Sequence, residues 1–444
     1  MSDEKTPIGV IGVGWVGLVT AACFAELGHE VWARDILQEK VDSLTRGEVP
    51  MHEPGLPELV RSNSERLHFT TEMSDLLDNA RLLFVCVDTP PTHSGDADLS
   101  RVRSVVEDMR GHTDHVLVMK STVPAGTGRT IRRDLSDIPY VSCPEFLKEG
   151  TAVKDFMHPD RVVVGCEPEH SGAGDAVSAL YEPLGAPIVR TDLASAEMIK
   201  LASNAFLATK ISFINEIANV CEEVGADVTQ VAEGMGSDER IGSQFLRAGI
   251  GYGGSCFPKD VSALKQLAGN SGYHFQLLTS VIEVNELQKR RVVGKLQKHL
   301  GTLVGKRIAL LGLSFKPDTD DMREASSLVL GARLQSEGAQ VTAFDPVVAD
   351  RARDMLQGTE FAASAIDAID GADALVLVTE WPEFRDLDWA DAAGRMAQAL
   401  IIDGRNFLDP EAMENAGFTY EGIGRHAVGE GADSPADPAR PVPS

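Results

Sequence analysis

A GxGxxG sequence near the start of the chain constrains its fold more than any other feature. The apolar strand IGVIGVG leads into it and the helical stretch WVGLVTAACFAELGH follows, so that Gly12, Gly14 and Gly17 stand at a strand-to-helix turn. Glycine allows a tight turn and a close approach of the backbone there. Gly28 suits the end of the helix, and EVWARD then predicts a second strand. Residues 7–35 therefore predict a strand–helix–strand unit with parallel strands.

An acidic residue at the end of the second predicted strand completes a dinucleotide-binding fingerprint. Asp35 occupies this place, where a carboxylate accepts hydrogen bonds from ribose hydroxyls while the glycine turn brings the pyrophosphate to the helix N-terminus. The same carboxylate repels a 2′-phosphate, so we expect NAD rather than NADP. Arg34 precedes Asp35, but successive side chains of a strand point to opposite faces, which turns Arg34 away.

Strand-like and helical segments alternate along most of the chain. Residues 193–224 contain neither proline nor glycine and predict one long helix ending at Gly225, with more helix at 277–300. Further strands are expected at 82–88, 115–121, 161–166, 306–316, 339–346, 372–380 and 398–406. The expected fold class is α/β, with two Rossmann-like doubly wound domains joined by a long central helix and a helical dimerisation domain.

A chain of 444 residues is too long for one compact core, so we expect several domains. The alternation of elements predicts an NAD-binding domain at 1–192 and a central helical domain at 193–301 that carries a cysteine loop. A C-terminal Rossmann-like domain is expected at 302–427. The tail at 428–444 is rich in proline, alanine, aspartate and glycine and is expected to be disordered.

The charge and cysteine patterns exclude several classes of function. The net charge is −26, which repels nucleic acid and anionic membranes. No apolar run reaches the ~20 residues that cross a bilayer, and the polar N-terminus shows no secretory signal, so we expect a cytoplasmic protein. The six cysteines form no CxxC pair and the eleven histidines no HExxH cluster, so no metal site is expected.

One cysteine, in the sequence GYGGSCFPKD, is a candidate nucleophile. Glycines surround Cys256, and Pro258 suits the first turn of a helix. Cys256 is then expected just before a helix N-terminus, where unpaired N–H groups and the helix dipole favour the thiolate. The cation of Lys259 favours the thiolate as well, whereas the carboxylate of Asp260 opposes it. The alternative interpretation is an inert, buried cysteine in a tight turn.

Polar segments at strand ends and on the long helix supply further candidates. DTPP and KSTVPAGT follow predicted parallel strands, so they are expected to line the cofactor cleft or else to be ordinary turns. In CPEFLKEG, Glu145 and Glu149 share one face if the segment is helical and could provide a general base. On the long helix, Lys200 and Asn204 share a face, a pair that by itself indicates surface more than catalysis.

Seven motifs, in order, resemble the nucleotide-sugar dehydrogenases of the UDP-glucose/GDP-mannose dehydrogenase family. They extend over residues 7–425 and are GVIGVGWVGL, KSTVPAGT, PEFLKEG, KLASNAFLATKISFINEIA, GMGSDERIGSQFLRAGIGYGGSCFPKD, GLSFKPDTDDMRE and DGRN. The stretch at 234–260 is similar to the branch that acts on UDP-glucose. Two positions depart from the family pattern: Cys143 stands where asparagine is common, and Lys148, in the presumed sugar loop, stands where alanine or arginine is common.

The resemblance implies NAD-dependent oxidation of UDP-glucose to UDP-glucuronate by a homodimer or higher homo-oligomer. This four-electron oxidation removes two hydrides, and a thiolate at Cys256 can hold the intermediate aldehyde as a thiohemiacetal and then as a thioester. By the resemblance, the ammonium of Lys200 stabilises the oxyanion. The other implied catalytic residues order or activate the hydrolytic water and are Asn204, Asp260, Glu145 and Thr122.

The resemblance also implies two sets of binding residues. The cofactor set is Gly12, Gly14, Val16, Gly17, Asp35, Lys40, Thr89, Thr122, Glu149, Lys259 and Arg323. The substrate set is Glu145, Phe146, Leu147, Lys148, Glu149, Lys200, Asn204, Arg240, Phe245, Tyr252, Gly253, Lys316 and Arg405. Within the second set, Arg240 is implied to reach the substrate of the neighbouring subunit.

Three alternatives stay open. The same chemistry could act on GDP-mannose or a UDP-N-acetylhexosamine. A two-electron dehydrogenase of the β-hydroxyacid type shares the Rossmann and helical domains but needs neither Cys256 nor a third domain. A nucleotide-sensing regulator on the same frame needs no nucleophile, although Cys256, Lys200 and Asp260 are all present.

Overall fold

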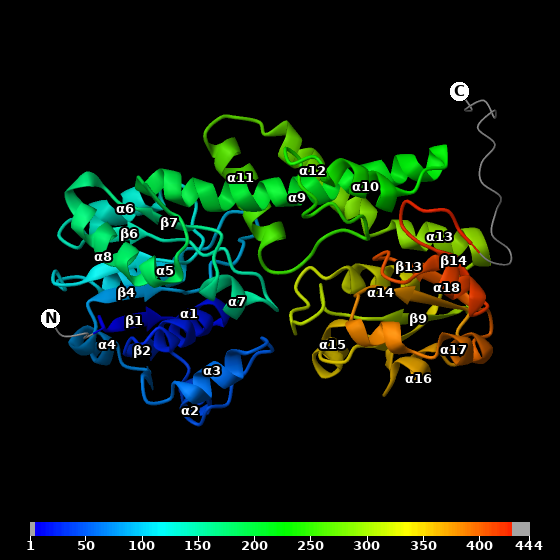
Figure 1. Ribbon diagram of the computed structural model, residues 1–444, viewed down its shortest axis with the longest axis horizontal. Coiled ribbons are helices and arrows are strands. Elements are labelled where there is room, and N and C mark those ends of the chain that lie inside the picture. Colours follow the sequence, from blue (N-terminus) through cyan, green and yellow to red (C-terminus); the bar gives the residue numbers. More distant parts are fainter. Residues whose placement is uncertain (1–4, 429–444) are drawn as a thin grey trace. The chain divides into compact units, whose positions relative to one another are not determined.

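The computed structural model describes residues 5–428, which form two compact units (Figure 1). Unit 1 comprises the described residues up to 204 together with 262–274, and unit 2 comprises 205–261 together with the described residues from 275 onward. The three-domain division expected from the sequence stays a prediction. In the part of the chain that the structure describes, no helix has the length and apolar character to cross a membrane.

The sheet of unit 1 has eight strands in the order β3-β2-β1-β4-β5-β6-β7-β8. The strands are β1 (Ile8–Ile11), β2 (Val31–Arg34), β3 (Leu67–Thr70), β4 (Leu82–Val85), β5 (Val116–Met119), β6 (Tyr140–Ser142), β7 (Val162–Gly165) and β8 (Ile188–Thr191). Neighbouring strands are parallel, except that β6 and β7 are antiparallel. The sequence missed β3, β6 and β8, which are short and carry polar residues. The expected doubly wound parallel sheet is therefore correct apart from one strand pair.

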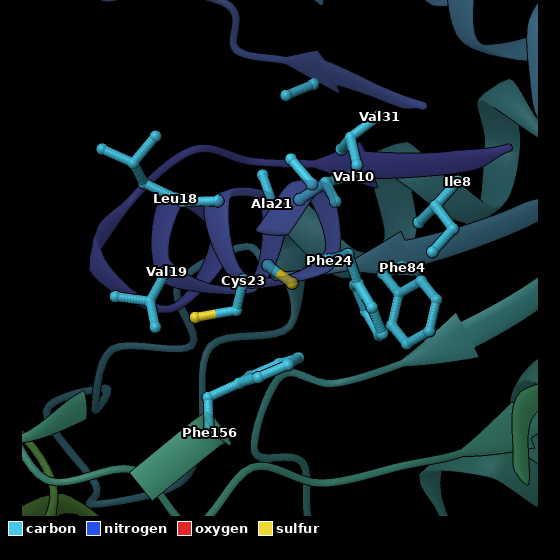
Figure 2. Packing of buried hydrophobic residues seen from close by; sticks show 14 of the residues in the cluster. Ile8, Val10, Leu18, Val19, Ala21, Cys23, Phe24, Val31, Phe84 and Phe156 are labelled. Carbon is cyan, nitrogen blue, oxygen red and sulfur yellow. The ribbon is translucent and has the colours of Figure 1, made fainter. Parts of the chain in front are cut away.

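Helices cover both faces of this sheet because side chains alternate along its strands. The helices are α1 (Trp15–Glu26), α2 (Gln38–Thr45), α3 (Leu56–Ser62), α4 (Met73–Asn79), α5 (Ser100–Asp108), α6 (Thr127–Asp134), α7 (Ala152–Met157) and α8 (Ser171–Tyr181). On one face, Val10 and Phe84 pack against α1, where Phe24 lies beside Phe84 and Phe156 (Figure 2), with ring centroids 5.2 and 5.1 Å away. On the other face, Ile11 packs with residues of α4, α5 and α6.

Unit 2 contains a second, six-stranded sheet in the order β11-β10-β9-β12-β13-β14, with all neighbours parallel. Its strands are β9 (Arg307–Leu311), β10 (Gln340–Phe344), β11 (Glu360–Phe361), β12 (Ala374–Leu377), β13 (Leu400–Asp403) and β14 (Thr419–Glu421). The helices of its α/β part are α14 (Ser326–Ser336), α15 (Ala349–Met355), α16 (Ala365–Ile369), α17 (Trp389–Arg395) and α18 (Pro410–Asn415). The expected tail at 428–444 lies outside the described residues except Val428, which forms an antiparallel bridge with Tyr420.

The second sheet repeats the carboxylate of the dinucleotide fingerprint but uses it for structure. Asp345 follows β10 as Asp35 follows β2, and it is 2% exposed. Its Oδ2 accepts the N–H of Leu313 at 2.6 Å and the indole N–H of Trp381 at 3.0 Å, while Oδ1 accepts from the backbone beyond β10. A carboxylate saturated in this way has no lone pair directed at a ribose.

Helical elements connect these sheets in the sequence. The helix α9 (Leu193–Val224) has the bounds that the sequence predicts and ends at Gly225, whose φ is +80°. It is followed by α10 (Val228–Gly236), α11 (Phe257–Asn270), α12 (Gln276–Gln288) and α13 (Arg291–Leu300). The helical stretch expected at 277–300 is thus two helices with a break at 289–290. Both α9 and α11 have residues in each unit.

Candidate active site

The turn after β1 has the geometry that a dinucleotide pyrophosphate needs. Gly12 has a φ of +91°, a left-handed conformation that favours glycine. A Cβ on Gly17 would lie 1.8 Å from the carbonyl oxygen of Gly12, so the first turn of α1, which includes Val16, can pack against the end of β1 only without it. A Cβ on Gly14 would meet only the carboxylate of Asp88, at 3.8 Å. The space before the helix N-terminus therefore admits an anion.

Asp35 lies beside this turn with its carboxylate held in place. Its Oδ2 accepts the backbone N–H of Val13 at 3.2 Å and the ammonium of Lys40 at 2.9 Å. The structure thus brings together two residues of the predicted cofactor set. The guanidinium of Arg34 is directed elsewhere and donates to the Thr71 carbonyl at 3.0 Å, so the expectation that Arg34 turns away is confirmed.

The turns after β4 and β5 bring two more predicted cofactor residues into contact. The hydroxyl of Thr89 donates to the backbone carbonyl of Thr122 at 2.8 Å, and Thr89 is buried. Because β1 and β4 are neighbours in the sheet while the chain leaves them in opposite directions, their carboxyl ends flank the topological switch point. Both turns therefore lie at the sheet edge where such folds bind dinucleotides.

A buried ion pair joins the segment after β6 to α9. The ammonium of Lys200 donates to Oε1 of Glu145 at 2.8 Å, and the two side chains are 4% and 6% exposed. Burial by itself raises the pKa of Glu145, but the Lys200 charge and hydrogen bond outweigh it, together with the N–H of Leu147, and the pKa falls below its ordinary value. The pair therefore keeps Glu145 as a carboxylate.

The segment 143–150, which we call the sugar loop, is irregular, so the condition under which Glu145 and Glu149 would share a helical face is not met. Its backbone bends back instead, with the N–H of Leu147 donating to Glu145 Oε2 at 2.5 Å. Lys148 is exposed, and its ammonium lies 3.4 Å from Asp155, while Glu149 is buried. These contacts stay within unit 1 and hold the loop without a helix.

Aromatic contacts order the middle of the sugar loop. The guanidinium carbon of Arg161 lies 3.7 Å from the ring centroid of Phe146, and the Lys200 ammonium lies 5.4 Å from the same centroid. Burial lowers the pKa of Arg161, although a guanidinium stays charged. Asn204, one turn after Lys200 on α9, is buried as Lys200 is. The interpretation of this pair as surface residues is therefore wrong.

In unit 2, Cys256 directly precedes the first residue of α11, as the sequence predicts. Its carbonyl accepts the first helical hydrogen bond, from the N–H of Asp260 at 2.9 Å, and its Sγ lies 3.6 Å from the Ser255 hydroxyl. Cys256 is intermediate in exposure, whereas four of the six cysteines are buried. The ammonium of Lys259 pairs with the Asp260 carboxylate, which is 1% exposed.

The remaining residues of the cysteine loop are held by close packing. The backbone of Tyr252 exchanges two hydrogen bonds with the amide of Asn285, at 2.8 and 3.1 Å. A Cβ on Gly253 would lie 2.2 Å from the carbonyl oxygen of Glu324, so only glycine fits. Phe245 has a φ of +64°, which is uncommon for a residue with a side chain. The loop therefore has one well-defined backbone path.

Arg405 connects this loop to the second sheet within unit 2. Its guanidinium donates to the carbonyls of Gly251 at 3.0 Å, Val378 at 2.7 Å and Phe315 at 3.3 Å. The ammonium of Lys316 lies 5.5 Å from the neighbouring ring of Phe315. Both predicted substrate cations thus lie at the carboxyl ends of β9 and β12, the switch point of the second sheet.

Two other predicted cations pair with their own neighbours in sequence. Arg323 donates to both carboxylate oxygens of Asp321, and its side chain is 62% exposed. Arg240 does the same with Asp238, and its side chain is 89% exposed. These pairings do not test the ligands assigned to the two arginines, which stay predictions.

Sequence reasoning missed two buried carboxylates in unit 1. Glu53 is 2% exposed and accepts hydrogen bonds from the start of α1 and from the end of the sugar loop. Glu197 is 2% exposed and accepts the N–H groups of Gly126 and Gly128 at the start of α6. An acid followed by Pro-Gly was the only local signal for the first, and the second stands among helical residues without one.

Comparison with known families gives three matches along the chain. The NAD binding domain of the UDP-glucose/GDP-mannose dehydrogenase family matches residues 6–185, its central domain matches 194–287, and its UDP binding domain matches 309–410. Unit 1 therefore holds the segment that matches an NAD-binding domain, in agreement with the glycine turn and Asp35.

Individual relatives are similar over nearly the whole chain. The UDP-glucose 6-dehydrogenase TuaD of Bacillus subtilis is 44% identical over 433 residues, which cover 95% of this chain and 94% of the relative. The UDP-glucose 6-dehydrogenase YwqF of the same organism is 46% identical, with 95% and 98% covered. The structure of a UDP-glucose dehydrogenase from Pyrobaculum islandicum superposes with a TM-score of 0.89 at 33% identity, covering 96% of this chain and 99% of that one.

Proposed function

Because this chain belongs to the UDP-glucose/GDP-mannose dehydrogenase family, we propose that it oxidises UDP-glucose to UDP-glucuronate with two NAD⁺ in succession. Relatives named UDP-glucose 6-dehydrogenase, at 43–46% identity, support this substrate over other nucleotide sugars. The observation that carries the mechanism is the position of Cys256 immediately before α11. An accessible thiol at a helix N-terminus is suited to covalent catalysis.

The residues around the first switch point fit NAD. Gly12, Gly14 and Gly17 leave the helix N-terminus open to the pyrophosphate, and Asp35 stands at the end of β2 to accept the ribose hydroxyls. Lys40 holds the Asp35 carboxylate in position. Bound NAD⁺ supplies the hydride acceptor for each oxidation.

Lys200 is proposed to stabilise negative charge on the substrate oxygen. Its ammonium is almost fully buried, where an electrostatic interaction is much stronger than in water. Glu145 keeps this ammonium in place, and Phe146 flanks it. The water that hydrolyses the thioester is proposed to be ordered by Thr122, Asn204 and Asp260.

Cys256 is proposed to hold the intermediate. Its thiolate adds to the carbon of the aldehyde formed by the first oxidation, which makes a C–S bond, and the aldehyde oxygen takes a proton from solvent to become a hydroxyl. Loss of the second hydride from that carbon, with the hydroxyl proton passing to solvent, leaves a thioester. Water then attacks the carbonyl carbon and the C–S bond breaks, which releases the carboxylate and the thiolate, while the two protons of the water pass to solvent.

The test is a comparison of Cys256→Ser with Cys166→Ser, because these are the two cysteines with intermediate exposure. Cys256→Ser should lose steady-state turnover by several orders of magnitude while still binding UDP-glucose, since an alkoxide forms less readily than a thiolate and an ester hydrolyses more slowly. Cys166→Ser should behave as the wild type, which should form two NADH per sugar.

The outcomes separate the alternatives. Near-normal turnover of Cys256→Ser with two NADH per sugar would refute the thioester course. One NADH per sugar consumed, with a stable aldehyde or ketone as the product, would point to the two-electron dehydrogenase. A panel of nucleotide sugars assayed with the wild type tests the choice of UDP-glucose over GDP-mannose and UDP-N-acetylhexosamines.

A homodimer built on α9 is part of the proposal. The aromatic side chains of Phe206 and Phe213, seven residues apart on this helix, are 66% and 49% exposed, and Val220, seven further on, is 55% exposed. Such a stripe is typical of a helix that packs against another helix. Arg240 is proposed to reach the partner's substrate. The cytoplasmic location expected from the sequence stays a prediction.

A further inference from the structure

Glu53 is a buried carboxylate that the proposed chemistry does not use. It lies between α2 and α3, in a segment without regular structure, and Gly55 ends this segment with a φ of +81°. The side chain points inward, and the residue is 2% exposed. Burying a carboxylate is costly unless strong hydrogen bonds compensate, so its partners define its role.

Three N–H donors to this carboxylate come from two places that are far apart in the sequence. The Oε2 atom accepts the indole N–H of Trp15 at 3.0 Å and the backbone N–H of Gly150 at 2.7 Å. The Oε1 atom accepts the backbone N–H of Ala152 at 2.8 Å. Trp15 is the first residue of α1, directly after the glycine turn, whereas Gly150 ends the sugar loop. One carboxylate therefore holds the start of the cofactor helix and the end of the sugar loop together.

The sugar loop is fixed at its other end by an independent contact. Glu145 pairs with Lys200 at 2.8 Å, and both lie in unit 1 with Glu53. The loop is thus anchored near its first residues to α9 and at its last residue to Glu53. Hydrogen bonds to a buried carboxylate are strong because the acceptor is charged. Removing the acceptor is costly, because the buried N–H donors are then left without a partner.

We propose that Glu53 is a positioning residue that fixes the sugar loop against the start of α1, so that the sugar and cofactor segments keep one relative geometry. It acts through Trp15, Gly150 and Ala152 and touches no reacting atom. The inference rests on the proposed function for the identity of the sugar, but its contacts are independent of that identity.

Glu53→Gln is the most direct perturbation. A glutamine has one acceptor oxygen and one NH₂, which is a donor. If the NH₂ takes the Oε2 position, it faces two donors, and if it takes the Oε1 position, it faces the N–H of Ala152. Either orientation breaks at least one of the three bonds without a change in size. Trp15→Phe is milder, because it removes one donor and keeps an aromatic ring.

A matched control is Glu58→Gln. Glu58 lies five residues further on, at the first turn of α3, and its side chain is 68% exposed with Arg61 as its partner. The charge change is the same, but no contact with the sugar loop is lost.

Two measurements on the full-length protein test the proposal. We expect Glu53→Gln to accelerate amide hydrogen exchange at Gly150 and Ala152 without ligands, and to raise KM for UDP-glucose about tenfold. Trp15→Phe changes the first residue of α1. It should raise the KM for UDP-glucose about threefold and also accelerate amide exchange at Gly150 and Ala152. Glu58→Gln should leave both unchanged.

The proposal is overturned if amide exchange and KM in Glu53→Gln and Trp15→Phe are the same as in Glu58→Gln. It is also overturned if these variants lower kcat while amide exchange and KM stay unchanged. If Glu53→Gln does not fold, amide exchange and KM measured on Trp15→Phe decide whether the proposal holds. If the wild type does not oxidise UDP-glucose, the proposed function fails, while the exchange comparison still decides the role of Glu53.

Discussion

Glu197 should make the stability of this protein fall as the pH rises through neutrality. It stands three residues before Lys200 on α9, and its carboxylate accepts the N–H groups of Gly126 at 2.6 Å and Gly128 at 2.7 Å. Burial raises its pKa to about 7, against the lowering effect of those two hydrogen bonds and of Arg129. The folded protein therefore holds a proton on this group at a pH where the unfolded chain has lost it.

The sign and size follow from proton linkage. A carboxyl with an ordinary pKa of 4.5 and a folded pKa of about 7 favours the folded state most below 4.5 and loses that contribution as the pH rises through 7. The whole contribution is about 3 kcal/mol, and about 2 kcal/mol of it is lost between about pH 5.5 and about pH 8.5.

Glu197→Gln removes the titration and keeps the shape. Equilibrium unfolding by urea should be measured for the wild type and the variant at about pH 5.5 and about pH 8.5. The difference in free energy of unfolding, Glu197→Gln minus wild type, should increase by about 2 kcal/mol from the lower to the higher pH, because only the wild type loses stability. Glu65→Gln, on an exposed residue of unit 1, is the control and should follow the wild type. Parallel pH dependences for Glu197→Gln and the wild type would refute the reasoning.

Three further predictions concern unit 2 and the dimer. Burial alone would raise the pKa of Glu421, but a histidine and two lysines lower it to about 2, so Glu421→Gln should cost about 3 kcal/mol at neutral pH, a penalty that shrinks as the pH falls from about 4.5 toward 2. Urea unfolding across that range checks this, and a constant penalty would contradict it. Phe206→Ser combined with Phe213→Ser should give a monomer in sedimentation experiments, whereas an intact dimer would exclude the α9 stripe. Inactive Arg240→Ala and Cys256→Ala should partly restore activity when refolded together, and proven mixed dimers without activity would place Arg240 outside the neighbouring site.

Much of unit 1 could be predicted because its signals are local. A glycine turn between a strand and a helix has few conformations, and the structure shows the close approach of Gly17 to Gly12 that the motif requires. The bounds of α9 were predictable because Gly225 ends a run without proline or glycine. The strands β3, β6 and β8 were missed because polar residues interrupt their apolar patterns, which leaves too weak a local signal.

The candidate site was less predictable where it depends on distant contacts. The sequence identified Glu145 and Lys200 separately, and the local pattern around each left its surroundings open. Glu145 shares a helical face with Glu149 only if its segment is helical, and Lys200 with Asn204 by itself indicates surface more than catalysis. The structure shows one buried ion pair between an irregular loop and α9, formed across 55 residues of sequence. Local periodicity cannot report a contact of this kind, because the free energy that compensates for burying each charge comes from the other.

The sequence by itself determined the order of elements, the dinucleotide turn and the position of Cys256 before a helix, since each depends on neighbouring residues and on backbone freedom. Only the tertiary structure decided which charges are buried and which groups compensate them. Glu53 accepts three N–H donors, and Glu197 accepts two at the start of α6. Asp345 repeats the carboxylate of the fingerprint in the second sheet, where it serves structure rather than ribose. The physical reason is that desolvation and hydrogen bonding act between groups brought together by folding, whatever their separation along the chain.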